Sequence, residues 1–153
     1  MSSNKLCLLL PPVCLLSFTS KISFCLLMIL FPDGRIVGGV KVFVTSSYQG
    51  DFVSVQQMCS QAGGKLASPQ DSAENSAVQQ IAAVYNKEVF LGINYIQTEG
   101  KFRYWNGQAV IYSTWALGEP NNDINNKDCV EIHPNGFWNE QNCREKRLRP
   151  KDL

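Results

Sequence analysis

The sequence has almost no charge imbalance and only one histidine. Its 153 residues include 14 basic and 13 acidic side chains, which gives a formal net charge of +1. This balance argues against a nucleic-acid partner, because proteins held on phosphates by bulk electrostatics carry a clear excess of positive charge. The single histidine, His133, stands at no recognisable spacing from a nucleophile or a general base, so we do not expect an enzyme.

The sequence also lacks the patterns of elongated and membrane-spanning proteins. It contains neither a Gly-X-Y period nor a heptad repeat, so these residues include no collagen-like region and no coiled-coil neck. A transmembrane helix requires about 20 continuous apolar residues. The apolar N-terminal part is interrupted by Pro11, Pro12 and Lys21, which disfavours a signal-anchor helix.

We predict instead that residues 1–35 form a hydrophobic leader. Lys5 followed by a roughly 11-residue apolar run fits a secretory signal peptide, although no small-x-small cleavage site is evident. A signal-anchor helix is the second interpretation, and a segment foreign to the rest of the chain is the third. Each interpretation places the start of the globular domain near residue 36.

The next part of the chain predicts an α+β fold. Asp51 and Asp71 are the expected N-caps of two amphipathic helices, and Asn86 is the expected end of the second. Short strands are expected at residues 36–45, 88–94, 102–105 and 109–115. Two helices followed by a series of short strands is the pattern of an α+β domain. The tryptophans expected in its core are Trp105, Trp115 and Trp138.

A polar loop is the most distinctive part of the sequence. Residues 118–128 contain almost no apolar side chain and many carboxylates and carboxamides, so this loop cannot bury itself. An apolar strand over 129–133, a Pro-Asn-Gly turn and a return through Trp138 then predict a β-hairpin. The hairpin should carry Asn139 and Glu140 back toward the loop.

We expect oxygen donors from these two segments to converge on one point. Glu119 and Asn121 belong to the loop, and Asn139 and Glu140 follow the hairpin turn. Several oxygen ligands, some of them charged and none of them soft, are what a hard cation such as calcium needs. The plainer alternative is that residues 118–128 are only a polar surface loop.

Several ordered segments resemble the C-type lectin domains, and among these the collectin branch that includes the surfactant proteins. The Glu-Pro-Asn triplet alone would be weak evidence, but the combination is specific. The resembling segments are residues 62–69, 73–75, 90–93, 98–102, 119–121, 129–132 and 138–143. The resemblance implies a C-type lectin-like fold over residues 36–148, with two helices, short antiparallel sheets and a long irregular ligand loop. A divergent tail over residues 149–153 follows.

The resemblance also implies a ligand site. In this family one set of side chains binds both calcium and the vicinal hydroxyls of a sugar, so we expect a secreted lectin that recognises glycans of the mannose type in innate defence. Glu119, Asn121 and Asn139 match the family's ligands. Glu140 stands where the family has an aspartate, and Lys127 stands where it has a glutamate.

Lys127 lowers the calcium affinity that we expect. At an effective dielectric constant of about 20, one unit charge at about 5 Å contributes roughly 3 kcal/mol against each charge of the metal. We therefore expect calcium binding, and sugar binding with it, to weaken by about tenfold to a hundredfold. Asp123 and Asp128 are candidate substitute ligands, and Glu99 and Asp128 match auxiliary calcium positions of the family.

The same segments are similar to the alpha-type phospholipase A2 inhibitors of snake blood. A calcium-independent domain that binds a protein, such as a secreted phospholipase A2, is therefore the alternative function. Lys127 favours this alternative, because an ammonium group harms metal binding but not contact with a protein. Collectins assemble as trimers, but the neck and collagen region that form them do not occur in these residues.

The family's disulfide pattern is only partly present among the six cysteines. The resemblance implies a bridge between Cys129 and Cys143, which would stabilise the fold by about 3 kcal/mol and requires an oxidising compartment. It also implies a bridge from Cys59 to a position where this chain has Lys151. Cys59 is then expected to be an unpaired buried thiol. The alternatives are an intermolecular bridge or a pairing with one of the leader cysteines, which are Cys7, Cys14 and Cys25.

Overall fold

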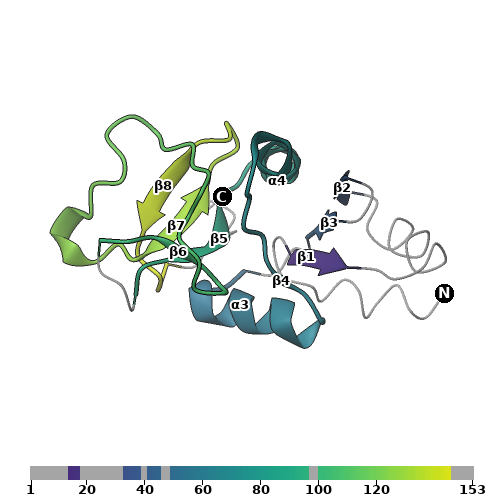
Figure 1. The fold of residues 1–153 in the computed structure, drawn as a ribbon, viewed down its shortest axis with the longest axis horizontal. Coiled ribbons are helices and arrows are strands. Elements are labelled where there is room, and N and C mark those ends of the chain that lie inside the picture. The colour runs from purple at the N-terminus through teal and green to yellow at the C-terminus, as the bar shows by residue number, and fades with distance from the viewer. Residues whose placement is uncertain (1–13, 18–32, 39–40, 46–48, 97–99, 146–153) are drawn as a thin grey trace, which may run out of the picture.

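The computed structural model describes residues 14–17, 33–38, 41–45, 49–96 and 100–145. These residues form two helices and two four-stranded antiparallel sheets, which confirms the predicted α+β fold. Figure 1 places the two helices between the sheets, and α4 (Ser72–Tyr85) contacts strands of both. The predicted tail at 149–153 lies outside the described residues.

Each helix begins at an aspartate that caps it. Asp51 accepts a hydrogen bond from the Ser54 amide at 2.9 Å, and α3 (Phe52–Gln61) starts directly after it. Asp71 accepts one from the Glu74 amide at 2.8 Å at the start of α4. The last turn of α4 ends at Asn86, whose φ of 49° is left-handed. These three predicted helix ends are confirmed.

The first sheet contains part of the predicted leader. Its strand order is β2 (Arg35–Val37), β3 (Lys41–Val44), β1 (Cys14–Ser17) and β4 (Lys65–Leu66), so β1 is an interior strand. Residue 15 pairs with Phe43 on one side and Lys65 on the other. The expected boundary at residue 35 therefore does not separate this sheet from the N-terminal segment. Cleavage of residues 1–35 stays a prediction.

The second sheet carries the predicted hairpin. Its order is β6 (Arg103–Tyr104), β5 (Val89–Asn94), β7 (Cys129–Ile132) and β8 (Trp138–Gln141). The predicted strand at 109–115 is wrong. That segment contributes only two isolated bridges, from Ala109 to Arg103 and from Trp115 to Trp138, because its two ends follow different partner strands.

The core surrounds Trp138, which is fully buried together with Val78, Leu91 and Val130. Trp115 packs against this cluster as a partly buried residue. The expectation for Trp105 is wrong, because 48% of this residue is exposed. Its position directly after the short strand β6, next to the Asn106-Gly107 turn, places it at the surface.

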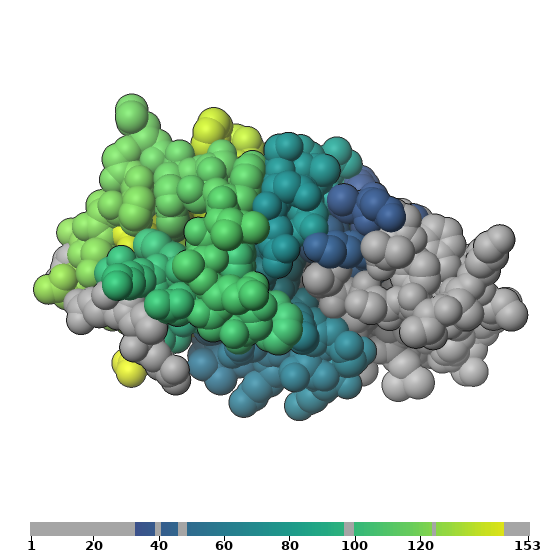
Figure 2. Space-filling model, in the orientation of Figure 1, coloured from purple at the N-terminus to yellow at the C-terminus, as the bar shows by residue number. Residues whose placement is uncertain are grey.

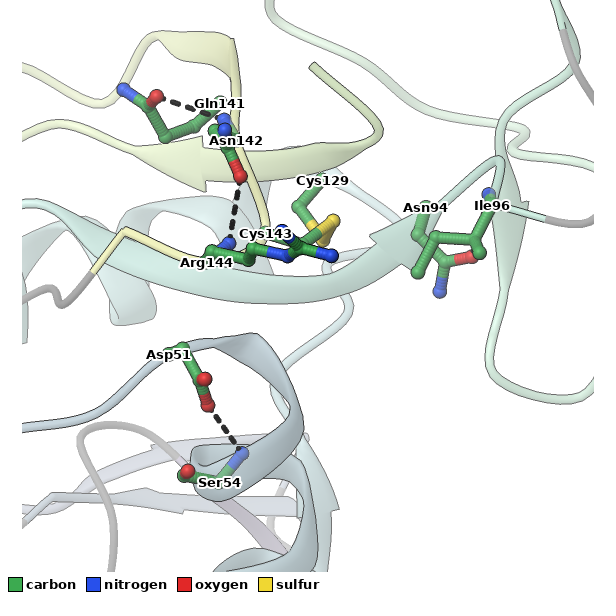
Figure 3. Close-up of a disulfide and its surroundings, with 9 residues drawn as sticks. All are labelled: Asp51, Ser54, Asn94, Ile96, Cys129, Gln141, Asn142, Cys143 and Arg144. Atoms are coloured by element: carbon green, nitrogen blue, oxygen red, sulfur yellow. Dashed lines mark hydrogen bonds between the residues drawn. A yellow bond between two sulfur atoms is a disulfide. The ribbon is translucent and has the colours of Figure 1, made fainter. Parts of the chain in front are cut away.

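Cys59, Cys129 and Cys143 are disulfide-bonded. Cys129 and Cys143 form the expected disulfide, with their Cα atoms 5.1 Å apart, and Figure 3 shows it near the N-terminal end of α3. The carbonyl of Cys143 also accepts a hydrogen bond from the Phe52 amide at 2.9 Å. Cys59 is fully buried and disulfide-bonded, so the prediction of an unpaired thiol is wrong. The two alternatives, a bridge to a leader cysteine and an intermolecular bridge, both include a disulfide at Cys59.

No helix among the residues that the structure describes is long and apolar enough to cross a membrane.

The interior position of β1 can be tested with proline. Proline lacks the amide hydrogen that an interior strand donates, so we expect Leu15→Pro to lower the free energy of unfolding by about 1–3 kcal/mol in urea denaturation. The control is Leu117→Pro. The Glu119 amide donates to the Ala116 carbonyl at 3.0 Å, and Gly118 has a φ of 84°, so residue 117 is the second residue of a turn that accepts proline. Equal stability of both variants would contradict a structural role for β1.

Candidate functional site

The predicted ligand loop begins alongside β8. The amide of Ala116 donates to the carbonyl of Trp138 at 2.9 Å, and the amide of Trp138 donates to the carbonyl of Thr114 at 2.8 Å. The rings of Trp115 and Trp138 meet edge to face at 5.7 Å. In Figure 2 the segments after residue 100, drawn in green to yellow, form one end of the molecule.

Helix α4 fixes the hairpin that leads into β8. Asn75 accepts a hydrogen bond from the Trp138 indole at 2.7 Å and donates one to the carbonyl of Gly136 at 3.1 Å. Gln79, one turn further along the same face, donates to the carbonyl of Pro134 at 2.7 Å. Buried polar groups need such partners, and these bonds hold the hairpin turn against the helix.

The carboxylate of Glu119 connects the loop to β8. One oxygen accepts a hydrogen bond from the Asn121 amide group at 2.6 Å, and the other accepts one from the backbone amide of Glu140 at 3.0 Å. The peptide bond between Glu119 and Pro120 is cis. Two of the predicted site residues from the loop are thus in contact with each other and with the strand that carries the other two.

Glu140 is buried beneath the loop, with 3% of the residue exposed. One carboxylate oxygen accepts a hydrogen bond from the Tyr95 hydroxyl at 3.0 Å, and the other accepts one from the backbone amide of Asn122. Both oxygens are therefore engaged by protein donors, and Glu140 positions the loop from below. Its role as a metal ligand stays a prediction.

Asn139 lies between Trp138 and Glu140 on β8. The strand alternates between buried and partly buried residues, with Trp138 and Glu140 buried. Because neighbouring side chains of a strand point to opposite faces, Asn139 and Glu140 face opposite sides of the sheet. The four predicted ligands therefore do not all point toward one place, because the two on β8 lie on opposite sides of the sheet.

The side chain of Lys127 contacts the Asn121 oxygen that was predicted to bind a cation. Its ammonium donates a hydrogen bond to Asn121 Oδ1 at 3.2 Å, and the backbone amide of Asp123 donates to the same oxygen at 3.0 Å. A positive charge thus occupies a position next to the oxygens that were expected to attract a cation.

The predicted auxiliary ligands are Asp123, Asp128 and Glu99. Asp123 is exposed at the start of the short 3-10 helix Asp123–Asn125. Asp128 is partly buried, and its backbone carbonyl accepts a hydrogen bond from the Tyr95 amide at 3.1 Å. Glu99 lies outside the described residues. A role for any of these three carboxylates in metal binding stays a prediction.

The donor atoms suit calcium in type, but their charge and arrangement do not suit it. Calcium takes 6–8 oxygen ligands. Of the expected oxygens, those of Glu140 are bound by protein donors, and Asn121 Oδ1 is bound by Lys127. No group of three or more His, Cys, Asp or Glu that could hold a metal occurs in the described part of the chain. As they stand, these residues fit a calcium ion poorly.

Two important contacts were missed from the sequence. Tyr95 is not among the predicted site residues, yet its hydroxyl donates a hydrogen bond to Glu140 at 3.0 Å. Asn75 is not among them either, yet its side chain accepts a hydrogen bond from the Trp138 indole at 2.7 Å. Strand alternation could have signalled the first contact, because a carboxylate two residues from a buried tryptophan shares its face and needs a donor.

Comparison with known proteins identifies the domain. Residues 48–149 match the family described as the lectin C-type domain. The chain is 49% identical over 119 residues to pulmonary surfactant-associated protein D of Bos taurus, covering 78% of this chain and 32% of that protein. It is 46% identical over 123 residues to collectin-43 of Bos taurus, covering 78% of this chain and 38% of that one. The chain thus spans about a third of the length of these relatives.

Solved structures agree on the fold. The mouse scavenger receptor C-type lectin carbohydrate-recognition domain superposes with a TM-score of 0.68 at 20% identity, covering 75% of this chain and 88% of that one. The cow carbohydrate-recognition domain of CD23, solved in the presence of a GlcNAc2Man3 oligosaccharide, superposes with a TM-score of 0.57 at 25% identity. The match covers 65% of this chain and 79% of that one. A calcium-independent type II antifreeze protein superposes with a TM-score of 0.65 at 22% identity, covering 74% of this chain and 85% of that one. From the family match and the identity to the collectins, the chain belongs to the C-type lectin domain family.

Proposed function

We propose that the chain is the carbohydrate-binding domain of a collectin-like lectin. The observation that carries this proposal is the Glu119 carboxylate, which joins Asn121 of the loop to the backbone of β8. A carboxylate accepts hydrogen bonds, and a carboxamide both donates and accepts them, so the pair suits vicinal hydroxyl groups. Glu119 and Asn121 are the proposed sugar-binding residues of the loop, and the resemblance adds Asn139 of β8, with a mannose-type sugar as the ligand.

The similarity to collectins supports this proposal, as does the CD23 domain whose structure was solved with an oligosaccharide. We also propose an extracellular location. The Cys129–Cys143 bridge and the disulfide of Cys59 support it, because disulfides form and persist in oxidising compartments.

We further propose that Lys127 weakens calcium binding at this site. Its ammonium lies 3.2 Å from Asn121 Oδ1, on the loop that also carries Glu119. Bringing a divalent cation to the same oxygen requires Lys127 to leave and adds repulsion between like charges. Lys127 is partly buried, so solvent and salt screen this repulsion only in part.

A second candidate function is calcium-independent recognition of a protein. The contact between Lys127 and Asn121 favours it, because the loop is held by protein groups at the position where a metal was expected. A secreted phospholipase A2 is the partner suggested by the resemblance to the alpha-type inhibitors.

Reversing the charge of residue 127 tests the calcium proposal. We expect Lys127→Glu to raise the calcium affinity by about tenfold to a hundredfold, because the ammonium is replaced by a carboxylate ligand. Isothermal titration of calcium into the full chain measures this change. Lys87→Glu, directly after α4, makes the same charge change elsewhere. If both variants gain calcium affinity equally, the local role of Lys127 is refuted.

Retention on immobilised mannose tests the sugar proposal. We expect weak retention in millimolar calcium, stronger retention for Lys127→Glu, and loss of both in chelator. If neither protein shows chelator-sensitive retention, the sugar proposal is wrong. Capture of a secreted phospholipase A2 in chelator would then support the second candidate function.

Replacing Glu140 tests whether protein groups hold the loop. Glu140→Ala leaves the Asn122 amide and the Tyr95 hydroxyl without their acceptor, so we expect the free energy of unfolding to fall by about 1.5–3 kcal/mol. Proteolysis within residues 118–128 should also become faster in chelator. Glu145→Ala, at an exposed position, is the control. Unchanged proteolysis would show that Glu140 does not position the loop.

A further inference from the structure

A cavity of about 310 Å³ lies between α3 and the end of β6. Figure 1 shows β6 and the segment after it beside α3. The residues that matter for its chemistry are Val53, Gln56, Asn94, Ile96, Arg103 and Trp105. None of the proposed sugar-binding residues of the loop lines this cavity, so it is a separate site.

Trp105 provides an aromatic wall. It is 48% exposed, and the neighbouring Val53 and Ile96 are 52% and 51% exposed. The backbone turn next to it is fixed, because the amide of Gly107 donates to the carbonyl of Tyr104 at 2.9 Å and the amide of Tyr104 donates to the carbonyl of Gln108 at 2.9 Å. The indole is therefore carried by a rigid turn, although no core packing requires it there.

Lys65 lies against the same indole. Its ammonium is 3.0 Å from the ring centroid of Trp105, a cation–π contact. Lys65, Gln56 and Trp105 also line an adjoining cavity of about 180 Å³. Trp105 lines both cavities, whereas Lys65 is among the described lining residues of the second cavity alone.

Arg103 supplies a positive charge to the first cavity itself. One of its guanidinium nitrogens donates to the carbonyl of Gly107 at 2.8 Å, which holds the side chain beside the turn. A guanidinium has five N–H donors, so others remain for a ligand. Among the residues that the structure describes, the charged side chains that line the two cavities are Arg103 and Lys65, and both are positive.

We propose that this cavity binds a sugar ring that carries a carboxylate. The apolar face of a sugar ring stacks on an indole, the amides of Gln56 and Asn94 suit its hydroxyls, and the Arg103 fork suits a carboxylate. The volume lies at the lower end of the range for small-ligand sites, as a single sugar ring requires. Binding at this site requires no metal and does not depend on the loop.

The experiment titrates the ¹⁵N-labelled full chain with glucuronate in the presence of chelator. Glucose is the neutral control ligand, and acetate is the control for the anion alone. We expect glucuronate to shift the indole N–H signal of Trp105 saturably, with at least tenfold weaker binding of glucose and acetate. The signal is assigned with Trp105→Phe. Chelator separates this site from the proposed loop site, so failure of one proposal is distinguishable from failure of the other.

Variants of Arg103 test the role of its charge and its shape. We expect Arg103→Gln to weaken glucuronate binding at least tenfold, and Arg103→Lys to weaken it less, because lysine keeps the charge but loses the planar fork. Lys87→Gln removes a positive charge elsewhere, and we expect it to leave glucuronate binding unchanged. Unchanged amide spectra away from the cavity verify that each variant folds.

Three outcomes would overturn the proposal. Equal binding of glucose and glucuronate would remove the role of the carboxylate. Equal binding of acetate would remove the role of the sugar ring. A Trp105 signal that does not respond to glucuronate would exclude the site.

Discussion

The burial of Trp138 is the constraint on which the rest of the domain depends. Its indole is fully buried, donates to Asn75 of α4 and meets Trp115 at the start of the polar loop. Its backbone exchanges hydrogen bonds with the residues around Trp115. One side chain thus ties the helix, the hairpin and the loop together, and the loop can remain polar because its starting point is fixed by apolar packing elsewhere.

Two residues after Trp138 on β8, Glu140 connects the strand to the loop through the Asn122 amide. A buried carboxylate is costly unless its oxygens are hydrogen-bonded, and Tyr95 and the Asn122 amide meet that need. The strand period then separates Glu140, which faces inward, from Asn139, which does not. The same two-residue period that buries Trp138 therefore buries Glu140, which positions the loop, and leaves Asn139 partly exposed.

The positions of individual charges, and not the net charge of the chain, distinguish the polar loop from the cavity beside α3. The chain is nearly neutral, but Lys127 contacts an oxygen of the loop, whereas Lys65 and Arg103 gather around Trp105. In the loop the ammonium of Lys127 donates a hydrogen bond to the Asn121 oxygen that the calcium prediction assigned to a cation. At the cavity beside α3, Arg103 is the charged side chain among the described lining residues, and its positive charge favours an anionic ligand.

The sequence alone determined the features that depend on neighbouring residues. The caps at Asp51, Asp71 and Asn86, the hairpin turn and the oxygen-rich loop all follow from local patterns, and the resemblance added the Cys129–Cys143 bridge. Only the tertiary structure decided which distant segments meet. It placed residues 14–17 between β3 and β4, buried Glu140 and exposed Trp105. Local patterns specify turns and helix ends, but burial and pairing depend on contacts between residues far apart in the chain, and these exist only in the folded molecule.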